Sequence, residues 1–492
     1  MARATAARRA ALRLLGECRR RSARARDLMR ASEGLDALEP RDRSLATRLV
    51  LGVTRCSGGL DGVIDGHLRR GMRLEPRLRD ALRVAAFELL FLSAPAQAAV
   101  SQGVELAREA SPRAAGLANA VLRRIAEEDR PRLAEARDRL HAAAAPGGRP
   151  VDEVSTPDSL AGDISLGCCL PGWLSRELVS SLGASRAAAV ALGSLEPSTP
   201  CVAGNLVVQG EGPSRLALEA AGLAPEPLPW PAAFRLGRPS ALAGSGLVRT
   251  SDVLPADLAA QVVAWLVCPR GGRLLEVGQG RGTKSLLLQS AARALDVDLR
   301  MACVESDPHK SASSARRLGS VGLAGRASCH ALDGRTLSGA DESLPEGLRG
   351  EFRLAFLDAP CSGSGTLRRH PEVAWSLGEE AALRELPKLQ LELLGAVARR
   401  VEVGGCLVYS TCSELRQEDE DVVAAFLASD VGREFSFAGP LDAPATGVLA
   451  PEQLALARSM LTPEGFLRTS RANRLGSPLC DGHFMARLCR LG

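Results

Sequence analysis

The stretch RLLEVGQGRGTKSLLLQSAARAL, residues 273–295, decides the fold of the second half of the chain. A short apolar run, RLLEVG, leads into a glycine-rich turn, and apolar residues at helical spacing follow. Similar helix and strand patterns alternate from about residue 250 toward the end of the sequence. This alternation predicts an α/β fold with a mostly parallel, Rossmann-like sheet that helices cover on both faces.

Ligands of such sheets bind beyond the carboxyl ends of the strands, so the residues that close each strand are site candidates. The first strand closes with the turn 278–284, whose glycines let the backbone approach a ligand. The second closes at Glu305, which can accept hydrogen bonds from ribose hydroxyls. The third closes at Asp333, placed for an adenine amine. Each acid alone also fits a helix cap or a solvated loop, but together they indicate an adenosine-type ligand.

Cysteines follow the next two strands. Cys361 lies in a turn that begins at Asp358, and Cys412 lies in Ser-Thr-Cys-Ser at 410–413. One long helix, 379–400, joins the two strands, so they can be neighbours about 4.8 Å apart. Both thiols would then lie at one edge of the sheet, near the ligand. Either cysteine alone fits a buried structural role, whereas the pair predicts a reactive site.

Four regions follow from the local patterns. Residues 1–140 repeat apolar side chains at helical spacing and predict a helical domain. Residues 141–164 are rich in Pro, Gly and Ala and suggest a linker. Residues 165–245 mix helix and strand signals, which suggests a small α/β subdomain. Residues 246–492 carry the alternating pattern and form the Rossmann-like domain.

The charge of the chain is unevenly distributed. Residues 1–150 carry 29 arginines and 18 acidic residues, a net charge of +11, while the rest has a net charge of −6. A basic front favours a polyanionic partner such as RNA, although solvated helical faces would give the same count. Aromatic residues make up only 3% of the chain, so arginine contacts with phosphates should outweigh base stacking. Arg368, Arg369 and His370 are candidates, or they form an ordinary basic loop.

The thirteen cysteines include no CxxC pair, so we expect neither a metal site nor a disulfide framework. Free thiols are typical of the reducing cytoplasm, which is the expected location. No apolar run has the length of a membrane span, and we expect no membrane partner. We expect a monomer.

Two segments carry a family resemblance. LDAPCSGSGTLRRHPEVAW (357–375) and VYSTCSELRQEDEDVV (408–423) resemble the cysteine motifs of the Sun/Fmu (RsmB-type) ribosomal RNA cytosine-C5 methyltransferases. Residues 1–140, with PAQAAVSQGVELA and GLANAVLRRI, resemble the NusB-like RNA-binding domain at the front of these enzymes. Residues 466–488 resemble their closing hairpin. The cofactor turn departs from the family, because Asp-x-Cys-Ala-Ala-Pro-Gly-Gly-Lys-Thr is replaced by EVGQGRGTKS.

The resemblance implies S-adenosyl-L-methionine as cofactor and ribosomal RNA of the small subunit as substrate, free or in an assembling particle. It makes Cys412 the nucleophile that adds to C6 of cytosine, and Cys361 the residue that assists product release. Asp358 would bind the N3/N4 edge of the base. The residues implied for the cofactor are Gly278, Gln279, Gly280, Arg281, Gly282, Thr283, Lys284, Glu305, Asp333 and Asp358.

Two other functions remain open at this point. A DNA cytosine-C5 methyltransferase would use a single Pro-Cys nucleophile, here Cys361, and would not need a second thiol at Cys412. A non-catalytic RNA-binding assembly factor would explain the altered cofactor turn.

Overall fold

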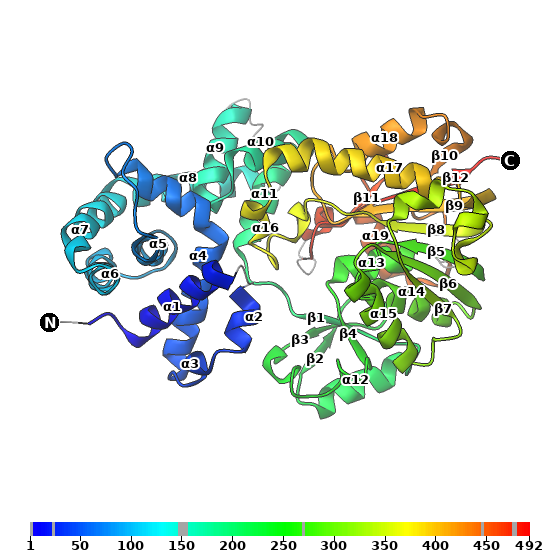
Figure 1. Ribbon diagram of the computed structural model, residues 1–492, viewed down its shortest axis with the longest axis horizontal. Helices are drawn as coiled ribbons and strands as arrows, with labels where there is room; N and C mark the ends of the chain where they lie inside the picture. The colour runs from blue at the N-terminus through cyan, green and yellow to red at the C-terminus, as the bar shows by residue number, and fades with distance from the viewer. Residues whose placement is uncertain (1–2, 22–24, 146–155, 268–270, 444–446, 475–479) are drawn as a thin grey trace. The chain divides into compact units, whose positions relative to one another are not determined.

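The computed structural model describes residues 3–21, 25–145, 156–267, 271–443, 447–474 and 480–492. The chain forms two units. The first comprises Met1–Glu196 and Leu367–Leu377, and the second comprises Pro197–Thr366 and Gly378–Gly492 (Figure 1). Each unit has its own core.

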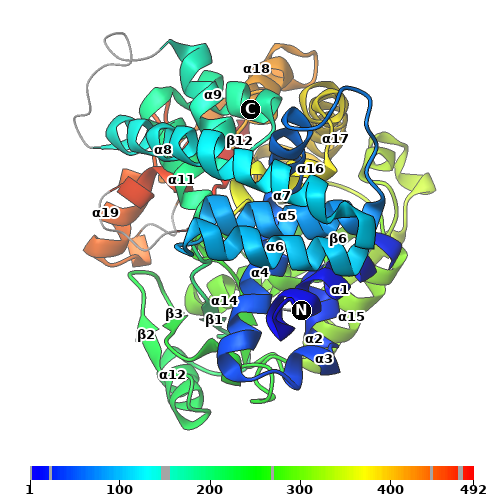
Figure 2. The same cartoon turned by 90° about the vertical axis from the view of Figure 1, so that its left-hand side faces the viewer.

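The first unit is helical, as predicted (Figure 2). Its longest helix, α4, begins at Pro40, where a missing backbone donor costs nothing, and it buries Leu49, Leu60 and Ile64. The helices of this unit with at least ten residues are α1 (Ala6–Arg21), α4 (Pro40–Gly66), α5 (Pro76–Phe91), α6 (Ala96–Ala110), α7 (Ala115–Arg124), α8 (Arg130–Ala144), α9 (Pro157–Cys168), α10 (Gly172–Leu182) and α11 (Ala184–Leu195).

The helices α9 to α11 correct two predicted boundaries. The predicted linker, 141–164, includes the end of α8 and the first two turns of α9, while residues 146–155 lie outside the described part. Arg139 on α8 donates to the Asp163 carboxylate on α9 at 2.8 and 2.7 Å, which fastens α9 to the helical unit. Residues 165–195 therefore do not belong with the strands that follow them.

The first unit also includes the segment 367–377, which follows the Cys361 turn in the sequence. Its short helix α16 (Val373–Ser376) lies against α4. The Trp375 indole N–H donates to the carbonyl oxygen of Arg55 at 2.9 Å, and a Cβ added to Gly58 would collide with the Trp375 ring. Gly58 is thus the position at which α4 accepts this tryptophan.

The second unit contains two sheets. The smaller is antiparallel in the order β2-β3-β1-β4, and α12 (Glu211–Ala220) lies between β1 and β2 in the chain. Its strands are β1 (Cys201–Gly204), β2 (Pro225–Pro227), β3 (Ala233–Leu236) and β4 (Val253–Pro255). The predicted small subdomain is therefore present as 201–255, later in the chain than the predicted 165–245.

The larger sheet has the order β10-β12-β9-β8-β5-β6-β7, and β11 pairs with β12. Five neighbouring strands, β9, β8, β5, β6 and β7, are parallel, as predicted, and β7 forms one edge of the sheet, whereas β12 and β10 are antiparallel at the other edge. These strands are β5 (Gly272–Val277), β6 (Leu299–Glu305), β7 (Ala327–Ala331), β8 (Phe352–Asp358), β9 (Val401–Thr411), β10 (Phe435–Ala438), β11 (Leu467–Arg468) and β12 (Phe484–Arg490). The unit's other helices are α13 (Leu258–Leu266), α14 (Thr283–Ala294), α15 (Pro308–Ser320), α17 (Leu386–Ala398), α18 (Glu420–Ala428) and α19 (Pro451–Ser459).

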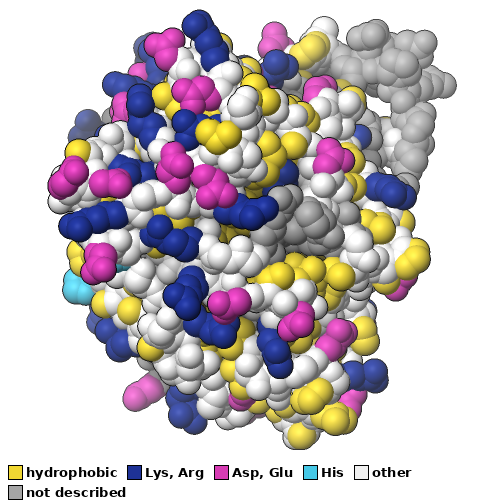
Figure 3. Space-filling view, turned by 90° about the vertical axis from the view of Figure 1, so that its right-hand side faces the viewer, with side chains coloured by type: hydrophobic (Ala, Val, Ile, Leu, Met, Phe, Trp, Pro, Cys, Tyr) yellow, Lys and Arg dark blue, Asp and Glu magenta, His cyan; other side chains and the backbone are white. Residues whose placement is uncertain are grey.

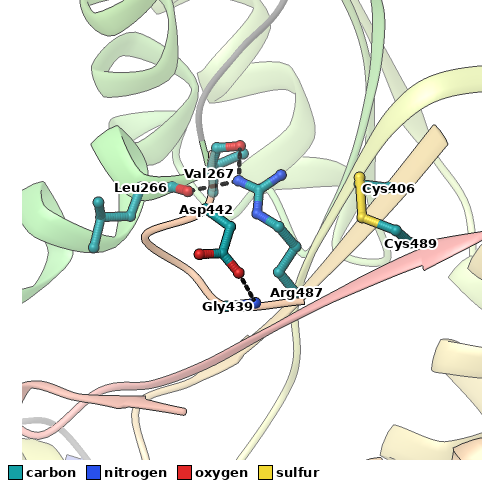
Figure 4. Close-up of a disulfide and its surroundings, with 7 residues drawn as sticks. All are labelled: Leu266, Val267, Cys406, Gly439, Asp442, Arg487 and Cys489. Atoms are coloured by element: carbon teal, nitrogen blue, oxygen red, sulfur yellow. Dashed lines mark hydrogen bonds between the residues drawn. A yellow bond between two sulfur atoms is a disulfide. The ribbon is translucent and has the colours of Figure 1, made fainter. Parts of the chain in front are cut away.

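A disulfide joins the last strand to the parallel sheet. Cys406 on β9 and Cys489 on β12 are directly opposed, with Cα atoms 4.2 Å apart, and Figure 4 shows the bond between them. Arg487 on β12 also donates to the carbonyl oxygens of Leu266 and Val267, each at 2.8 Å, at the end of α13. The expectation of free thiols is wrong for this pair, because the pairing of β9 with β12 depends on contacts 83 residues apart.

Among the described residues, no helix combines the length and apolar character that a membrane span requires. Within the same residues, no group of three or more His, Cys, Asp or Glu side chains could hold a metal ion.

Candidate active site

The order of the central strands brings the predicted site residues to one edge of the sheet. β5 lies between β6 and β8, and β9 lies beside β8 with Asp358 opposite Ser410. The chain runs from β5 outward to β6 and β7 and then crosses back to β8 on the other side of β5, and such a switch point is where these sheets bind ligands. The prediction that the two strands preceding the cysteines are neighbours is confirmed.

The glycine turn after β5 has one crowded side and one open side. Gly278 has φ +85°, and a Cβ there would collide with the carbonyl oxygen of Asp358. Gly280 has φ +59°, yet a Cβ there would meet no atom within 4 Å. Both conformations favour glycine, and the open space at Gly280 leaves the backbone accessible to a ligand.

Glu305, at the end of β6, supports this turn. One of its carboxylate oxygens accepts the Gly280 N–H at 2.7 Å, and the other accepts the Asp307 N–H at 3.0 Å. An ionised carboxylate has about four acceptor sites, so capacity for ribose hydroxyls remains. Glu305 therefore holds the turn as well as standing at the predicted ribose position.

Asp333 makes the contacts of a helix cap. Its carboxylate accepts the Arg335 backbone N–H at 2.9 Å, and the Arg335 side chain pairs with it at 2.7 Å. The Arg335 hydrogen bonds lower the pKa of Asp333. Asp333 thus caps the short helix that follows it, and its contact with an adenine amine stays a prediction.

Three other residues of the predicted cofactor turn differ in environment. Gln279 is buried and donates to Ser285 Oγ at 3.2 Å and to Cys329 Sγ at 3.4 Å, so its side chain fills the interior instead of facing a ligand. Thr283 Oγ1 accepts from Arg317 at 2.9 Å. Arg281 is exposed at the turn.

The two thiols meet. The Sγ atoms of Cys361 and Cys412 lie 3.2 Å apart, and the Cys412 backbone N–H points at Cys361 Sγ from 3.3 Å. The hydrogen bond from Cys361 lowers the pKa of the Cys412 thiol, burial opposes this, and the Lys284 ammonium lowers it further. The same hydrogen bond and burial raise the pKa of Cys361. The pair therefore favours a Cys412 thiolate that receives a hydrogen bond from a Cys361 thiol.

Lys284, predicted as a cofactor-binding residue of the turn, pairs with the predicted catalytic residue Asp358. Its Nζ is 2.5 Å from Asp358 Oδ1, and both side chains are largely buried. The ammonium also lies 6.0 Å from the centre of the Phe356 ring. Lys284 thus fixes the Asp358 carboxylate and places a positive charge near Cys412.

Backbone hydrogen bonds clasp the two cysteine turns to the chain before β12. The Gly365 N–H donates to the Cys412 carbonyl at 3.0 Å, and the Gly482 N–H donates to the Gly365 carbonyl at 2.8 Å. A Cβ on Gly365 would collide with the Gly482 backbone. The close approach at Gly365 explains a glycine in the Cys361 turn.

Sequence reasoning missed two buried charged groups beside Cys412. Glu418 accepts hydrogen bonds from Ser362 and Ser413, the residues that follow the two cysteines. Arg468 on β11 is 1% exposed and pairs with three acids of the segment after Cys412: Glu414 at 3.2 Å, Asp419 at 3.0 Å and Glu420 at 2.8 Å. The run QEDED reads as an ordinary acidic helix start, so its sequence gave no signal of these contacts.

The prediction that the basic segment after Cys361 contacts RNA is wrong for one of its residues. Arg368 is only 6% exposed, so its side chain is not the solvated phosphate contact that the sequence suggested. His370 lies 3.6 Å from the Glu372 carboxylate, within the same segment.

The chain is similar to known methyltransferase sequences. The family model described as 16S rRNA methyltransferase RsmB/F matches residues 282–438, and the NusB family model matches residues 5–127. Ribosomal RNA small subunit methyltransferase B of Salmonella typhi is 28% identical over 410 residues, which cover 82% of this chain and 86% of that protein. A candidate methyltransferase of Mycobacterium tuberculosis is 30% identical over 429 residues, 85% of this chain and 86% of that protein.

Solved structures share the fold. The crystal structure of PH0851 matches with a TM-score of 0.69 and 20% identity over 98% of both chains. The structure of NSun6 from Pyrococcus horikoshii with SFG matches with a TM-score of 0.51 and 13% identity, over 65% of this chain and 98% of that one.

Proposed function

Because the chain belongs to the RsmB/F family of 16S ribosomal RNA methyltransferases, we propose that it methylates C5 of a cytosine through a covalent bond from Cys412. The observation that carries the proposal is the pair of thiols at 3.2 Å, beside the Lys284–Asp358 ion pair. The test is methyl transfer to 16S ribosomal RNA followed by identification of the modified base.

The residues at the sheet edge fit S-adenosyl-L-methionine, the cofactor of this family. Gly280 offers an open backbone, and Glu305 retains acceptor capacity at the end of the adjacent strand. When bound, the cofactor supplies an electrophilic methyl group on a sulfonium. The Gln279 side chain faces the interior, so the turn would bind the cofactor through its backbone and through Glu305.

C5 of cytosine is a weak nucleophile and needs activation. Attack by the Cys412 thiolate forms an S–C6 bond and moves the C5=C6 electrons onto C5, which can then take a methyl group. Loss of the C5 proton to a base re-forms the double bond and breaks S–C6. Cys361, 3.2 Å from the departing sulfur, donates a hydrogen bond that stabilises it as a thiolate leaving group.

Asp358 and Lys284 serve the same step. Asp358 is placed to hydrogen-bond the N3/N4 edge and favour a protonated N3, which draws electrons from C6. Its ion pair with Lys284 restricts the carboxylate to one orientation. The target base must leave a helical stack or be unpaired to reach this half-buried pair of thiols.

The DNA-enzyme alternative is disfavoured by the charges around the thiols. It requires Cys361 as nucleophile, but the hydrogen bond and burial raise the pKa of Cys361 and so oppose its ionisation. The Lys284 charge instead favours a thiolate at Cys412. This asymmetry supports Cys412 as the attacking residue.

Replacing Glu305 with Ala should weaken S-adenosyl-L-methionine binding by about 1–3 kcal/mol, because buried hydroxyl donors and the Gly280 N–H would lose their acceptor. Isothermal titration calorimetry measures this change. Asp341→Ala, which removes an acid that pairs with Arg400 away from the turn, is the control. An unaltered dissociation constant for Glu305→Ala would place the ribose elsewhere, and no binding by the intact protein would favour the non-catalytic assembly factor.

Replacing Lys284 with Met should shift the pH dependence of methyl transfer. The rate rises with pH as Cys412 loses its proton, and the Lys284 charge lowers the pKa of that thiol. Its removal therefore moves the rising limb to higher pH. Lys310→Met removes an exposed lysine of α15, and it should not change the pH at which the rate of methyl transfer is half-maximal, the midpoint of the rising limb. An unchanged midpoint in Lys284→Met would exclude Lys284 as the group that favours the thiolate.

We expect the loop 67–75 between α4 and α5 to contact RNA phosphates, because Arg69, Arg70 and Arg73 are exposed there. By contrast, the surface in Figure 3, on the β9 and β12 side of the second unit, intersperses basic and acidic side chains. Replacing the three arginines with Ser should weaken RNA binding. The negative slope of log K for RNA against log salt concentration should become shallower by about 2–3.

The matched control removes the same charge from arginines that already pair with acids: Arg215, Arg235 and Arg384. Titration of labelled RNA at several salt concentrations measures both triple variants. Equal losses in the two would show that only the net charge matters.

A further inference from the structure

The turns that carry the two thiols converge on one buried carboxylate. Glu418, which is 0% exposed, accepts the Ser362 N–H at 2.7 Å on one oxygen. Its other oxygen accepts the hydroxyls of Ser362 and Ser413, each at 2.5 Å. Ser362 directly follows Cys361, and Ser413 directly follows Cys412. The carboxylate therefore connects the two turns at the positions next to the sulfurs.

Neighbouring elements hold Glu418 in place. Gln390 of α17 donates to the same carboxylate at 3.1 Å and to the Pro360 carbonyl at 2.8 Å. The Tyr409 hydroxyl of β9 donates to the Glu418 backbone carbonyl at 2.5 Å. The carboxylate receives four hydrogen bonds in all, which matches the acceptor capacity of an ionised acid. An apolar residue here would leave several buried donors without a partner.

We propose that Glu418 is a positioning residue that sets the distance between the Cys361 and Cys412 sulfurs by binding the serines that follow them. This role rests on the proposed function of the two cysteines. Glu418 does not touch a sulfur and acts only through Ser362 and Ser413. Loss of its hydrogen bonds would free the two turns, and the hydrogen bond between the sulfurs would weaken.

The charge of Glu418 acts in the opposite direction to its hydrogen bonds. A negative carboxylate near both sulfurs opposes thiolate formation, so its field raises the pKa of Cys412. The positioning effect preserves the Cys361 hydrogen bond, which lowers the pKa of Cys412. A variant that removes only the charge of Glu418 should therefore lower the pKa of Cys412, whereas a variant that removes only the hydrogen bonds to the serines should raise it.

The experiment measures the rate at which iodoacetamide alkylates Cys412 in the full chain as a function of pH, with peptide mass spectrometry to separate Cys412 from Cys361. Glu418→Gln keeps the size and removes the charge, and its amide N–H groups can donate to the Ser362 and Ser413 hydroxyls in place of the bonds that the carboxylate accepts. The pH midpoint of Cys412 alkylation should therefore fall by about half a unit or more. Glu418→Ala removes both the charge and the hydrogen bonds, and loss of the Cys361 hydrogen bond should raise the midpoint. The double variant Ser362→Ala/Ser413→Ala keeps the charge and should also raise it.

Downward shifts in both Glu418 variants would mean that Glu418 acts by charge alone, and that result overturns positioning. An unmoved midpoint in the double serine variant also overturns it, and so does wild-type methyl transfer by Glu418→Ala. The serine variant keeps the test decisive if Glu418→Ala does not fold. Alkylation needs no RNA, so absence of cytosine methylation by the intact protein would count against the proposed function and leave this test standing.

Discussion

Cys412→Ala is expected to form no covalent link to RNA and to transfer no methyl group, whereas Cys361→Ala is expected to accumulate as a protein–RNA adduct. Removal of Cys412 removes the sulfur that attacks C6. Removal of Cys361 leaves that sulfur in place but deletes the hydrogen bond, across 3.2 Å, that stabilises it as a leaving group. The same deletion makes Cys412 harder to ionise, so the adduct should form faster as the pH rises.

A denaturing gel measures this difference, because an adduct migrates slowly and disappears after nuclease digestion. Cys18→Ala, which removes a thiol of the helical unit, should behave like the intact protein. If the roles are reversed, Cys361→Ala will be the variant without an adduct. Absence of adducts in both variants, and with 5-fluorocytidine RNA and intact protein, would exclude covalent catalysis.

Gly278→Ala is expected to destabilise the fold strongly, by about 2–4 kcal/mol, and to abolish cofactor binding. Its φ of +85° disfavours any residue with a Cβ, and that Cβ would collide with the carbonyl oxygen of Asp358. Gly280→Ala is the matched variant, since it has φ +59° but free space around the added carbon. It should cost only about 1–2 kcal/mol.

Chemical denaturation and calorimetric titration distinguish the two glycine variants. Gly280→Ala should fold and bind S-adenosyl-L-methionine more weakly, because its methyl group stands on the open side of the turn. Equal stability of the two variants would contradict the crowded contact with Asp358. Full cofactor affinity in Gly280→Ala would mean that the ligand does not approach this side.

The site residues could be predicted where a reactive or acidic side chain directly follows a predicted strand. Glu305, Asp358 and the two cysteines close apolar runs, and parallel strands bring their carboxyl ends to one edge, so local patterns were sufficient. The neighbouring placement of β8 and β9 followed from a single crossover helix. The helical front followed from its 3.6-residue periodicity in the same way.

Features that depend on side-chain direction or distant pairing could not be predicted. Gln279 belongs to the turn but faces the interior, and Arg368 is buried in a basic segment. Glu418 gains its role only because the Cys361 turn folds onto it from 56 residues away. The helix α9 within the predicted linker begins at a Thr156 cap and pairs with α8 through Asp163 and Arg139, a contact that composition does not reveal.

Identification of the nucleoside that receives the methyl group decides whether this protein methylates C5 of cytosine through Cys412. Purified protein is incubated with 16S ribosomal RNA lacking its modifications and with S-adenosyl-L-methionine carrying an isotope-labelled methyl group, and the RNA is digested to nucleosides for mass spectrometry. Label is expected in 5-methylcytidine with the intact protein and is expected to be absent with Cys412→Ala. Label in another nucleoside would exclude cytosine C5 as the target, and labelled 5-methylcytidine formed by Cys412→Ala would exclude Cys412 as the nucleophile.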